Sequence, residues 1–451
     1  MDTPVAGFLG EYQQSDLSRF HMPGHKGQGP LGCESWDITE VLGADALYEA
    51  DGIIARAEAN TAAVFGAGRT LWSTEGSSQC VKAMLYLAVT CRREGTAPVV
   101  LAARNVHKSF VFAAGLVGFD VEWLWPEKTG SLCACPVTAK QLEAALAGME
   151  TPPCAVYLTS PDYLGNVQDI RALARVAHKY GCLLLVDNAH GAYLHFLDKP
   201  CHPLDQGADL CCDSAHKTMP VLTGGAWLHI AKRVGRVLTN RAKDAMALFG
   251  STSPSYLTMA SLDVCNAWME GPGGEQIRLA AQRVERLKET LTGKGWALVG
   301  QEALKLTLDA KAVGMTGEAL GQKLREGGVE PEYVDPDFVV LMASAYTDEE
   351  AFRRVEAALG EAPASQRPET APAAETDFRP QRAMSIRQAL LAPSEEVSVK
   401  KALGRVCAAP TVSCPPAIPI VASGEVFDKE AVEMLERYGV GRCLVVREVK
   451  G

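Results

Sequence analysis

The chain has 451 residues, of which 47% are hydrophobic and 22% are charged. These proportions exclude an intrinsically disordered protein and predict two or three domains with a sizeable core. The 44 Lys and Arg residues against 54 Asp and Glu residues give a formal net charge of −10. Because phosphate-rich partners need a basic surface, this balance argues against nucleic acid as the main partner and against a polybasic membrane attachment.

The cysteines and the start of the chain indicate a cellular compartment. The 14 cysteines include no Cys-x-x-Cys pair and are too sparse for a disulfide scaffold. We therefore expect free thiols in a reducing cytoplasm and no metal site. The first 14 residues show no basic region followed by an apolar core, and no apolar stretch approaches the roughly 20 residues of a membrane span. The sequence predicts a cytoplasmic protein without a signal peptide or a membrane segment.

Helices and short apolar strands alternate along the first part of the chain. Residues 1–54 are rich in Gly, Pro and Asp, and we expect an extended arm with turns. The predicted strands are 98–103, 120–125, 154–159 and 182–187, and the predicted helices are 77–89, 138–147 and 169–180. This alternation is typical of βαβ units, so the predicted fold class is α/β with a mainly parallel sheet covered by helices.

The second part of the chain begins at a Gly-Pro-Gly-Gly break, residues 271–274. A long charged helix, 275–291, is predicted next, and short strands follow at 304–308 and 338–343. Segment 361–380 is dominated by Ala, Pro, Glu and Thr and is predicted to be a flexible linker. The expected organisation is an arm (1–54), a large domain (55–268), a small α+β C-terminal domain in two parts (269–360 and 381–451) and the linker between those parts (361–380).

A carboxylate and a lysine stand out by their position. Asp187 follows the apolar strand 183–186, so it is expected at the carboxyl end of a parallel strand, where open α/β sheets bind ligands. A buried carboxylate needs a partner. A protonated pyridine nitrogen is one, and a helix cap or a structural ion pair is the alternative. Lys217 comes 30 residues later among small, mostly uncharged residues. Desolvation there would make its amine a nucleophile for Schiff-base chemistry, whereas an ordinary loop lysine is simply solvated.

Two further motifs follow predicted strands. Gly76, Ser77 and Ser78 lie at the start of the predicted helix 77–89, and they predict an anion site at its N-terminus, although the same residues also make an ordinary cap. The stretch Arg104–Ser109 follows the strand that ends at residue 103 and brings the imidazole of His107 to the same sheet edge. A purely structural histidine is the alternative. A phosphate cap, a flat imidazole, a carboxylate and a lysine are the groups that pyridoxal 5′-phosphate requires, so we predict this cofactor.

In these motifs the chain resembles the Orn/Lys/Arg decarboxylase class-I family, which consists of pyridoxal-phosphate-dependent enzymes with the aspartate-aminotransferase fold, fold type I. The resemblance spans about residues 8–430 and places the chain among the shorter members, which lack an N-terminal wing domain. The stretches that carry it are Phe20–Gly27, Arg104–Ser109, Ser160–Gly165, Asp187–Gly191, Asp213–Lys217, Ser251–Tyr256 and 383–425, the last including Leu403–Arg405 and Pro415–Pro419.

The resemblance implies a role for each of these motifs. Lys217 would form the Schiff base, Asp187 would pair with the pyridine nitrogen, and His107 would stack on the ring. Either Lys217 or His216 would protonate Cα of the product. The other cofactor-binding residues would be Gly76, Ser77, Ser78, Ser214 and His216 around the phosphate, His190 lining the pocket, and Ser251, Thr252 and Ser253 reaching the phosphate of a neighbouring subunit.

The implied reaction is decarboxylation of arginine, lysine or ornithine to a polyamine-type amine by a homodimer with its active sites at the subunit interface. Glu425 would bind the distal cation of this small cationic substrate, and an ordinary surface residue is the alternative. Three motifs depart from the family. Residues 414–419 read Cys-Pro-Pro-Ala-Ile-Pro instead of Tyr-Pro-Pro-Gly-Ile-Pro, Ser423 replaces the Pro of Pro-Gly-Glu, and Asn188 replaces Glu. The first two lie near the expected substrate end and leave the choice of substrate open.

Two other functions are compatible with the same sequence. Another pyridoxal-phosphate reaction on this fold, such as an aminotransferase or a lyase, would keep Lys217 and Asp187 but would need an arginine for a second carboxylate. A non-catalytic paralogue that acts as a scaffold or regulator would explain the altered C-terminal motifs. The presence of Lys217 argues against that paralogue.

Overall fold

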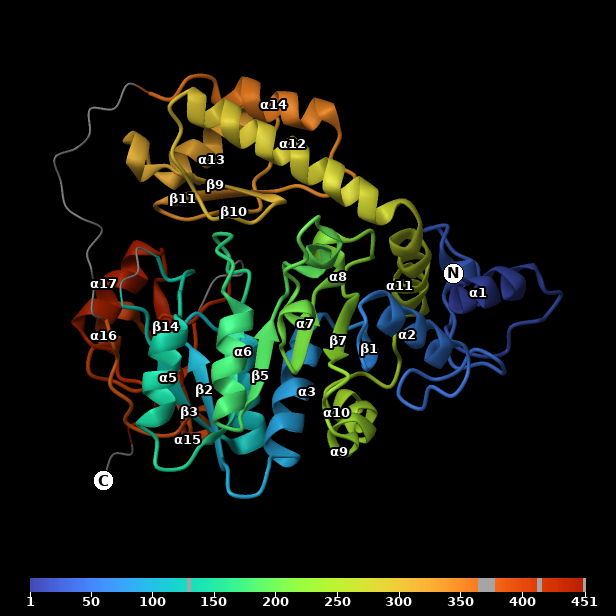
Figure 1. Cartoon of the computed structure of the whole chain (residues 1–451), viewed down its shortest axis with the longest axis horizontal. Coiled ribbons are helices and arrows are strands. Elements are labelled where there is room, and N and C mark those ends of the chain that lie inside the picture. The colour runs from blue at the N-terminus through green and yellow to red at the C-terminus, as the bar shows by residue number, and fades with distance from the viewer. Residues whose placement is uncertain (128–130, 364–377, 412–415, 449–451) are drawn as a thin grey trace. The chain divides into compact units, whose positions relative to one another are not determined.

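The computed structural model describes residues 1–127, 131–363, 378–411 and 416–448, which form two compact units (Figure 1). The first unit comprises Met1–Ala97, Leu146–Ser160 and Asp169–Arg278, and the second comprises Pro98–Ala145, Pro161–Gln168 and Leu279–Gly451. Each unit therefore collects segments that are distant in sequence. The domain boundaries given above stay a prediction.

The core of the first unit is a sheet whose edge collects the ends of several strands. Its strands lie in the order β1 (Arg69–Ser73), β7 (Ala226–Ile230), β6 (Leu210–Asp213), β5 (Leu183–Asp187) and β4 (Pro153–Thr159). Strands β4, β5 and β6 are parallel, and β7 runs antiparallel to both β6 and β1. The carboxyl ends of β1, β4, β5 and β6 consequently meet at one edge of the sheet.

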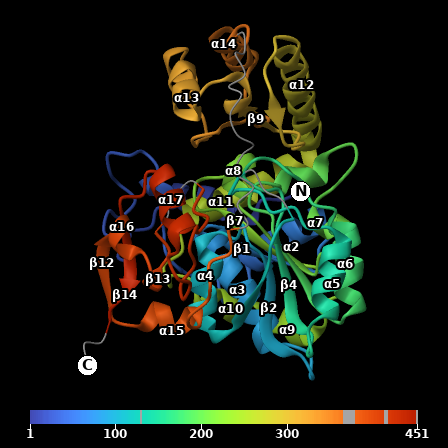
Figure 2. The same cartoon turned by 90° about the vertical axis from the view of Figure 1, so that its left-hand side faces the viewer.

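Helices cover both faces of these strands, and Figure 2 shows α3 and α6 on opposite sides of them. Helix α3 (Ser77–Thr90) is buried along most of its length because nearly all its residues after the first turn are apolar or small. Helix α6 (Ile170–Lys179) is amphipathic, since its buried residues recur with the helical period. The Asp169 side chain accepts a hydrogen bond from the Ala172 amide (3.0 Å) and caps it. The remaining helices described in this unit are α1 (Pro4–Gln14), η1 (Glu34–Trp36), α2 (Ile53–Val64), η3 (Ala192–Phe196), α7 (Pro203–Gln206), α8 (Ala215–Thr218), α9 (Arg236–Asn240), α10 (Ala242–Leu248), α11 (Tyr256–Trp268) and η4 (Met269–Gly273).

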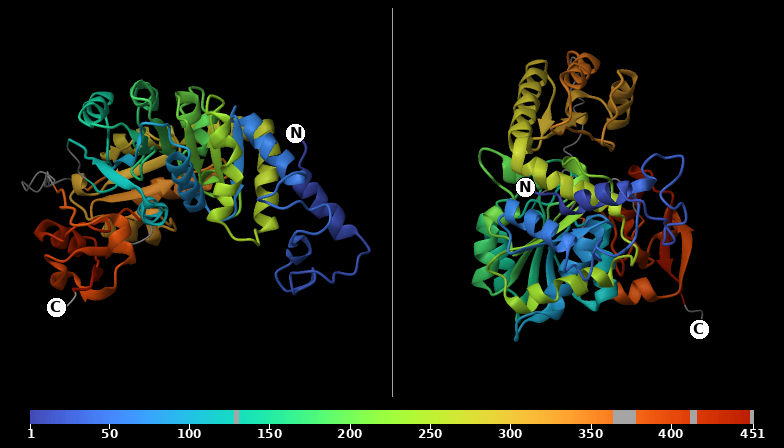
Figure 3. Two further views of the ribbon diagram at one scale, coloured as in Figure 1. Left: turned by 90° about the horizontal axis from the view of Figure 1, so that it is seen from below. Right: turned by 90° about the vertical axis from the view of Figure 1, so that its right-hand side faces the viewer.

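The second unit contains three separate strand groups. Strands β2 (Ala97–Ala103) and β3 (Asp120–Leu124) pair in parallel. Figure 3 shows the helices coloured yellow to orange on one face of an antiparallel sheet. That sheet has the order β10 (Tyr333–Val334), β11 (Phe338–Met342), β9 (Lys305–Asp309) and β8 (Leu298–Val299), and its helices are α12 (Gly274–Gly293), α13 (Gly317–Glu326) and α14 (Glu349–Leu359). A three-stranded sheet has the order β12 (Ser394–Ser398), β14 (Arg442–Val446) and β13 (Cys407–Ala409). The unit also contains α4 (Lys108–Ala113), η2 (Ala114–Gly118), α5 (Ala139–Ala147), η5 (Lys311–Val313), α15 (Ile386–Leu391), α16 (Val399–Ala402) and α17 (Lys429–Arg437).

Most of the predicted elements are confirmed to within one or two residues at each end. The Thr138 hydroxyl accepts a hydrogen bond from the Gln141 amide (3.2 Å) and caps α5 as expected. The Gly-Pro-Gly-Gly break is also confirmed, because α11 ends at Trp268 and the backbone at Gly271 leaves the helical conformation. Residues 364–377 of the predicted linker lie outside the described residues.

The expectation of an extended N-terminal arm is wrong for Pro4–Gln14, which form helix α1. Proline is favourable in the first turn of a helix, and Val5 and Leu9 are buried. The cap comes from helix α11, where an Asp263 carboxylate oxygen accepts hydrogen bonds from the Val5 and Ala6 amides (2.8 and 3.0 Å). The sequence around α1 contains no sign of this cap, because Asp263 lies more than 250 positions away.

This cap predicts a pH-dependent stability. Burial raises the pKa of Asp263 from 3.8 to about 6, against the opposing effect of the two amide donors. The folded protein therefore retains a proton that the unfolded chain loses, and the free energy of unfolding decreases as the pH rises from about 4 to 6. Asp263→Asn keeps an acceptor oxygen but cannot titrate. We expect the stability of the wild type relative to this variant to fall across that window, as measured by urea unfolding. A difference that does not change with pH would contradict the prediction.

Candidate active site

The first unit brings most of the predicted site residues to one edge of its sheet. Asp187 is the last residue of β5, and Asp213, the last residue of β6, is followed at once by Ser214 and helix α8. Helix α3 begins at Ser77, four positions after β1 ends at Ser73. Since these strands end at the same edge, the carboxylate, the lysine and the helix N-terminus predicted from the sequence share one region of the unit.

Asp187 is buried among neutral donors and one cation. One carboxylate oxygen accepts a hydrogen bond from the Tyr157 hydroxyl (3.1 Å), and the other accepts from the Ala189 amide (3.2 Å) and, more distantly, from the Cys212 thiol (3.7 Å). Burial raises the pKa of Asp187, while the positive charge of Lys217 acts in the opposite direction. A carboxylate in this environment gains most from a cationic N–H partner, which a protonated pyridine nitrogen provides.

Lys217 lies on α8 within reach of a histidine. Its Nζ is 2.8 Å from Nε2 of His190, which is buried, while Lys217 itself is partly exposed. The neighbouring His216 donates from Nδ1 to the carbonyl of Gly225 (3.0 Å), and this bond fixes its imidazole. The three side chains place a nucleophilic amine and two imidazoles at the same edge as Asp187.

The N-terminus of α3 has the properties of a phosphate site. Gly76 has φ 70° and ψ 178°, a conformation that favours glycine, and no side chain caps the helix. A Cβ on Gly76 would meet no atom within 4 Å, so the space beside it is open. Ser214 and Ser77 join through their hydroxyls (2.8 Å), and Ser78 is partly exposed on the same turn. Uncapped amides and hydroxyls are suitable donors for a phosphate, so the residues of this unit fit pyridoxal phosphate at both ends.

The predicted trans contributors lie on an exposed segment. Ser251, Thr252 and Ser253 connect α10 and α11, and all three are exposed. The Ser253 amide donates to the Ser251 hydroxyl (3.1 Å), which makes the segment a tight turn. Their role at a neighbouring subunit stays a prediction.

His107 belongs to the second unit, where it caps helix α4. Its Nδ1 accepts from the Ser109 amide (3.2 Å) and lies 2.8 Å from the Ser109 hydroxyl. These contacts at Nδ1 fix the orientation of the His107 imidazole. Stacking on the cofactor stays a prediction.

Glu425 is almost completely buried in the second unit, so the alternative of an ordinary surface residue is wrong. Its Oε2 accepts from the Arg104 guanidinium (3.1 Å) and from the Ala422 amide (2.7 Å). The guanidinium also donates to the carbonyls of Pro419 and Ile420 (both 2.9 Å). Its Cζ lies 5.0 and 5.2 Å from the rings of Trp123 and Trp125. The carboxylate is thus held by an internal cation, and its binding of a substrate cation stays a prediction.

The altered motif before Glu425 contains a strained residue. Ala417 has φ 57°, in the left-handed region that glycine adopts freely, and glycine is the family's residue at this position. Its carbonyl accepts from the Lys108 amide at the start of α4 (2.8 Å). Cys414 and Pro415 lie outside the described residues.

Sequence reasoning did not identify Tyr157 as a partner of Asp187. It lies on β4 within a run of buried residues, and its hydroxyl reaches the carboxylate from the neighbouring strand. A buried tyrosine usually has a hydrogen-bond partner for its hydroxyl, so a tyrosine in an apolar strand was the available signal.

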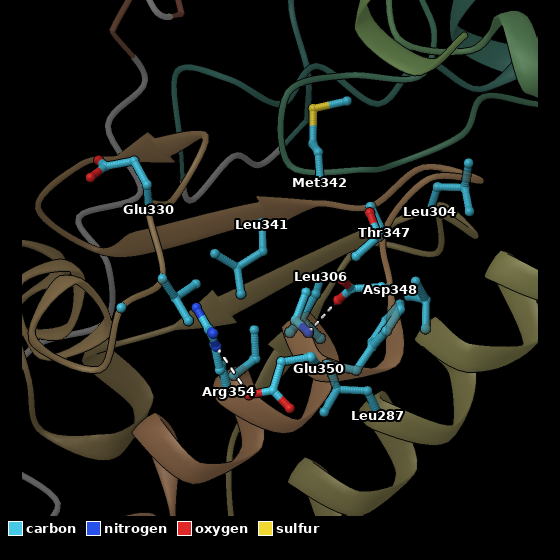
Figure 4. Close-up of a pocket in the computed structure, with 17 residues that line it drawn as sticks. Leu287, Leu304, Leu306, Glu330, Leu341, Met342, Thr347, Asp348, Glu350 and Arg354 are labelled. Carbon is cyan, nitrogen blue, oxygen red and sulfur yellow. Dashed lines mark hydrogen bonds and ion pairs between the residues drawn. The ribbon is translucent and has the colours of Figure 1, made fainter. Parts of the chain in front are cut away.

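A pocket of about 420 Å³ lies elsewhere, within the second unit, and none of the predicted site residues lines it. Figure 4 shows Leu306 and Leu341 from two strands, Leu287 from α12, and Glu350 and Arg354 from α14 around it. Glu350 and Arg354 form an ion pair with each other (3.2 Å). The pocket is therefore mostly apolar, with paired charges at its rim.

The fold and these groups define a pyridoxal-phosphate-dependent enzyme of fold type I. The chain matches the Orn/Lys/Arg decarboxylase major domain over residues 3–299 and the C-terminal domain of the same enzymes over residues 366–438. It belongs to the Orn/Lys/Arg decarboxylase family, and it is a decarboxylase that depends on pyridoxal phosphate.

Two curated relatives from Bacillus subtilis are similar over nearly their full lengths. The uncharacterized protein YaaO is 30% identical, with 97% of this chain and 94% of the relative covered. An arginine decarboxylase is 29% identical, with 96% and 93% covered. Among solved structures, the constitutive lysine decarboxylase of Escherichia coli has a TM-score of 0.78 at 18% identity, covering 99% of this chain and 82% of that one. At this identity the structural likeness shows the fold alone.

The ion pair of Glu425 predicts a large loss of stability on mutation. Glu425→Ala leaves the Arg104 guanidinium buried without its carboxylate, and we expect the free energy of unfolding to fall by about 3–5 kcal/mol in denaturant titrations. Glu436→Ala, which removes the exposed partner of Lys400 in the same unit, serves as the control and should cost less than about 1 kcal/mol. If the Glu425→Ala variant is as stable as the wild type but has a raised KM, the prediction is wrong, and the Glu425 carboxylate instead binds the substrate.

Proposed function

We propose that the protein removes the α-carboxyl group of a basic amino acid (arginine, lysine or ornithine) and releases the corresponding polyamine-type amine and carbon dioxide. The observation that carries the proposal is the proximity of Lys217, His190 and buried Asp187 at one sheet edge in a chain of this family. Relatives named arginine decarboxylase, from Bacillus subtilis and Bacillus anthracis, cover 96% and 97% of this chain and make arginine the first substrate to test.

In this proposal the residues at the cofactor edge of the first unit have defined tasks. Bound pyridoxal phosphate supplies an electron sink for the electron pair that remains when carbon dioxide leaves. Lys217 would hold the cofactor through its amine, and the Asp187 carboxylate would keep the ring nitrogen protonated. Ser77 and Ser214, with the free amides of α3, hold the phosphate. The Lys217 amine or His216 would then deliver the proton to Cα that completes the product amine.

Two further residues are proposed to act on the cofactor ring and the substrate. His107 would stack on the cofactor ring, and Glu425 would attract the distal cation of the substrate. Because Oε2 of Glu425 already accepts from Arg104 and from the Ala422 amide, any attraction would come from its other oxygen, Oε1.

We also propose a cytoplasmic homodimer. The exposed Ser251–Ser253 segment would complete the phosphate site of the other subunit, as the family resemblance implies. Among the described residues, no helix is both long and apolar enough to cross a membrane.

The test is a panel of arginine, lysine and ornithine with the purified holoenzyme. Released carbon dioxide is measured, and the product amines are identified by mass. We expect one of the three to be decarboxylated and Lys217→Ala to lower kcat by roughly 10³-fold or more. Lys199→Ala, at an exposed lysine of the same unit, is the matched control and should leave the rate unchanged. Amino transfer without carbon dioxide would refute decarboxylation, and a wild-type protein with no cofactor absorption band would favour a scaffold.

A further inference from the structure

A fully buried cluster of His202, Asp213 and His229 lies directly beside the cofactor edge. Asp213 ends β6 and His229 lies on the adjacent β7, while His202 precedes α7. The Nε2 atoms of both histidines point to the same oxygen of Asp213, at 3.0 and 3.2 Å. All three side chains are completely inaccessible to solvent. The mechanism proposed above assigns them no task.

The second nitrogen of each histidine also has a partner. Nδ1 of His229 lies 2.8 Å from the Thr70 hydroxyl, which can donate to it, and Nδ1 of His202 accepts from the Leu204 amide (3.4 Å). Both Nε2 atoms then carry the protons that they donate to Asp213. Burial lowers the pKa of His229 and favours its neutral form. Burial alone would raise the pKa of Asp213, but its histidine partners outweigh that effect and hold it well below the usual range.

Two members of this cluster form a possible metal site with Cys211, since donor atoms of His202, Cys211 and Asp213 lie within 4.8 Å of one another. A metal ligand must offer a lone pair, however, and Nε2 of His202 is already protonated by the argument above. Burial also raises the pKa of Cys211, so its thiol stays protonated. The geometry therefore favours a hydrogen-bonded anion over a bound ion.

Asn188 connects this anion to the cofactor residues. Its amide donates to the carbonyl of Cys212 (3.0 Å), and its side-chain Nδ2 donates to the free oxygen of Asp213 (2.7 Å). Asn188 directly follows Asp187, and Asp213 directly precedes Ser214. A hydrogen bond between two buried side chains thus adds to the backbone pairing of β5 and β6. It lies where the strand end that carries the proposed ring-nitrogen partner meets the strand end that carries the proposed phosphate and lysine residues.

We propose that Asn188 and Asp213 are positioning residues, and that the two histidines keep Asp213 ionised so that its bond to Asn188 fixes the spacing between Asp187 and the Ser214–Lys217 segment. The inference rests on the cofactor roles of Asp187 and Lys217 under the proposed function. The negative charge of Asp213 matters because a carboxylate can accept from His202, His229 and Asn188 at once. An amide at position 213 would turn an N–H group toward one of these donors.

The experiment compares Asn188→Leu, which has a similar volume but no donor, with the wild type as full-length holoenzyme. The readouts are the dissociation constant of pyridoxal phosphate, followed by its visible absorption band, and kcat and KM for the amino acid that the wild type decarboxylates. We expect cofactor affinity to fall about 10- to 100-fold, the loss of one charge-assisted hydrogen bond, with kcat lowered and KM nearly unchanged. The double variant with Asp213→Asn and Asn188→Asp exchanges the donor and the acceptor and so restores the pair. It should bind the cofactor more tightly, and have a higher kcat, than Asn188→Leu.

His178→Gln is the matched control, because His178 forms a similar pair with Asp209 (2.8 Å) in the same unit, away from the cofactor edge. It should leave both readouts unchanged. If Asn188→Leu does not fold, Thr70→Val removes only the outermost bond of the cluster and should weaken cofactor binding about two- to fivefold.

Unchanged cofactor affinity and kcat in a folded Asn188→Leu variant would overturn the inference. Stoichiometric zinc in the purified wild type, lost in His202→Ala, would overturn it in favour of a metal site. A wild type that binds no pyridoxal phosphate would instead refute the proposed function, so the two failures are distinguishable.

Discussion

The structure of the cofactor edge depends on keeping one carboxylate, Asp187, out of water at the end of a strand. Burial alone disfavours its charge, and the protein opposes this with a tyrosine hydroxyl, a backbone amide and a nearby lysine. Because none of the hydrogen-bonding groups carries a full positive charge, the carboxylate remains available to a cationic ligand. The parallel strands that surround it supply the apolar environment that makes its charge effective.

The local sequence was sufficient for much of this edge. Runs of apolar residues predicted β4 and β5, and with them the position of Asp187 at the end of β5. Lys217 was singled out by its small, mostly uncharged neighbours, although the strand before it, β6, was not predicted. These signals are local, because a buried parallel strand and the residue that follows it are contiguous in the chain. The same reasoning predicted helix α3 and a glycine at its start, Gly76, where a ligand can approach the backbone closely.

What the sequence did not reveal are contacts between distant segments. The cap of α1 comes from Asp263, and the partner of Glu425 is Arg104, 321 positions away. Tyr157 reaches Asp187 only because β4 and β5 are neighbours in the sheet. In each case residue type suggests that a partner is needed, but the strand order and helix packing determine which residue supplies it. A single sequence contains no direct record of that choice.

Ala417 has a consequence for how the loop before Glu425 is held. A left-handed backbone costs a residue with a Cβ roughly 1–2 kcal/mol, so the loop does not prefer this conformation by itself. The Lys108 amide and the Arg104 guanidinium, which bind carbonyls at 417, 419 and 420, must therefore impose it. The loop is therefore held in a strained conformation. Displacing Arg104 or the start of α4 would remove the contacts that hold it, and the segment would relax to a backbone conformation of lower energy.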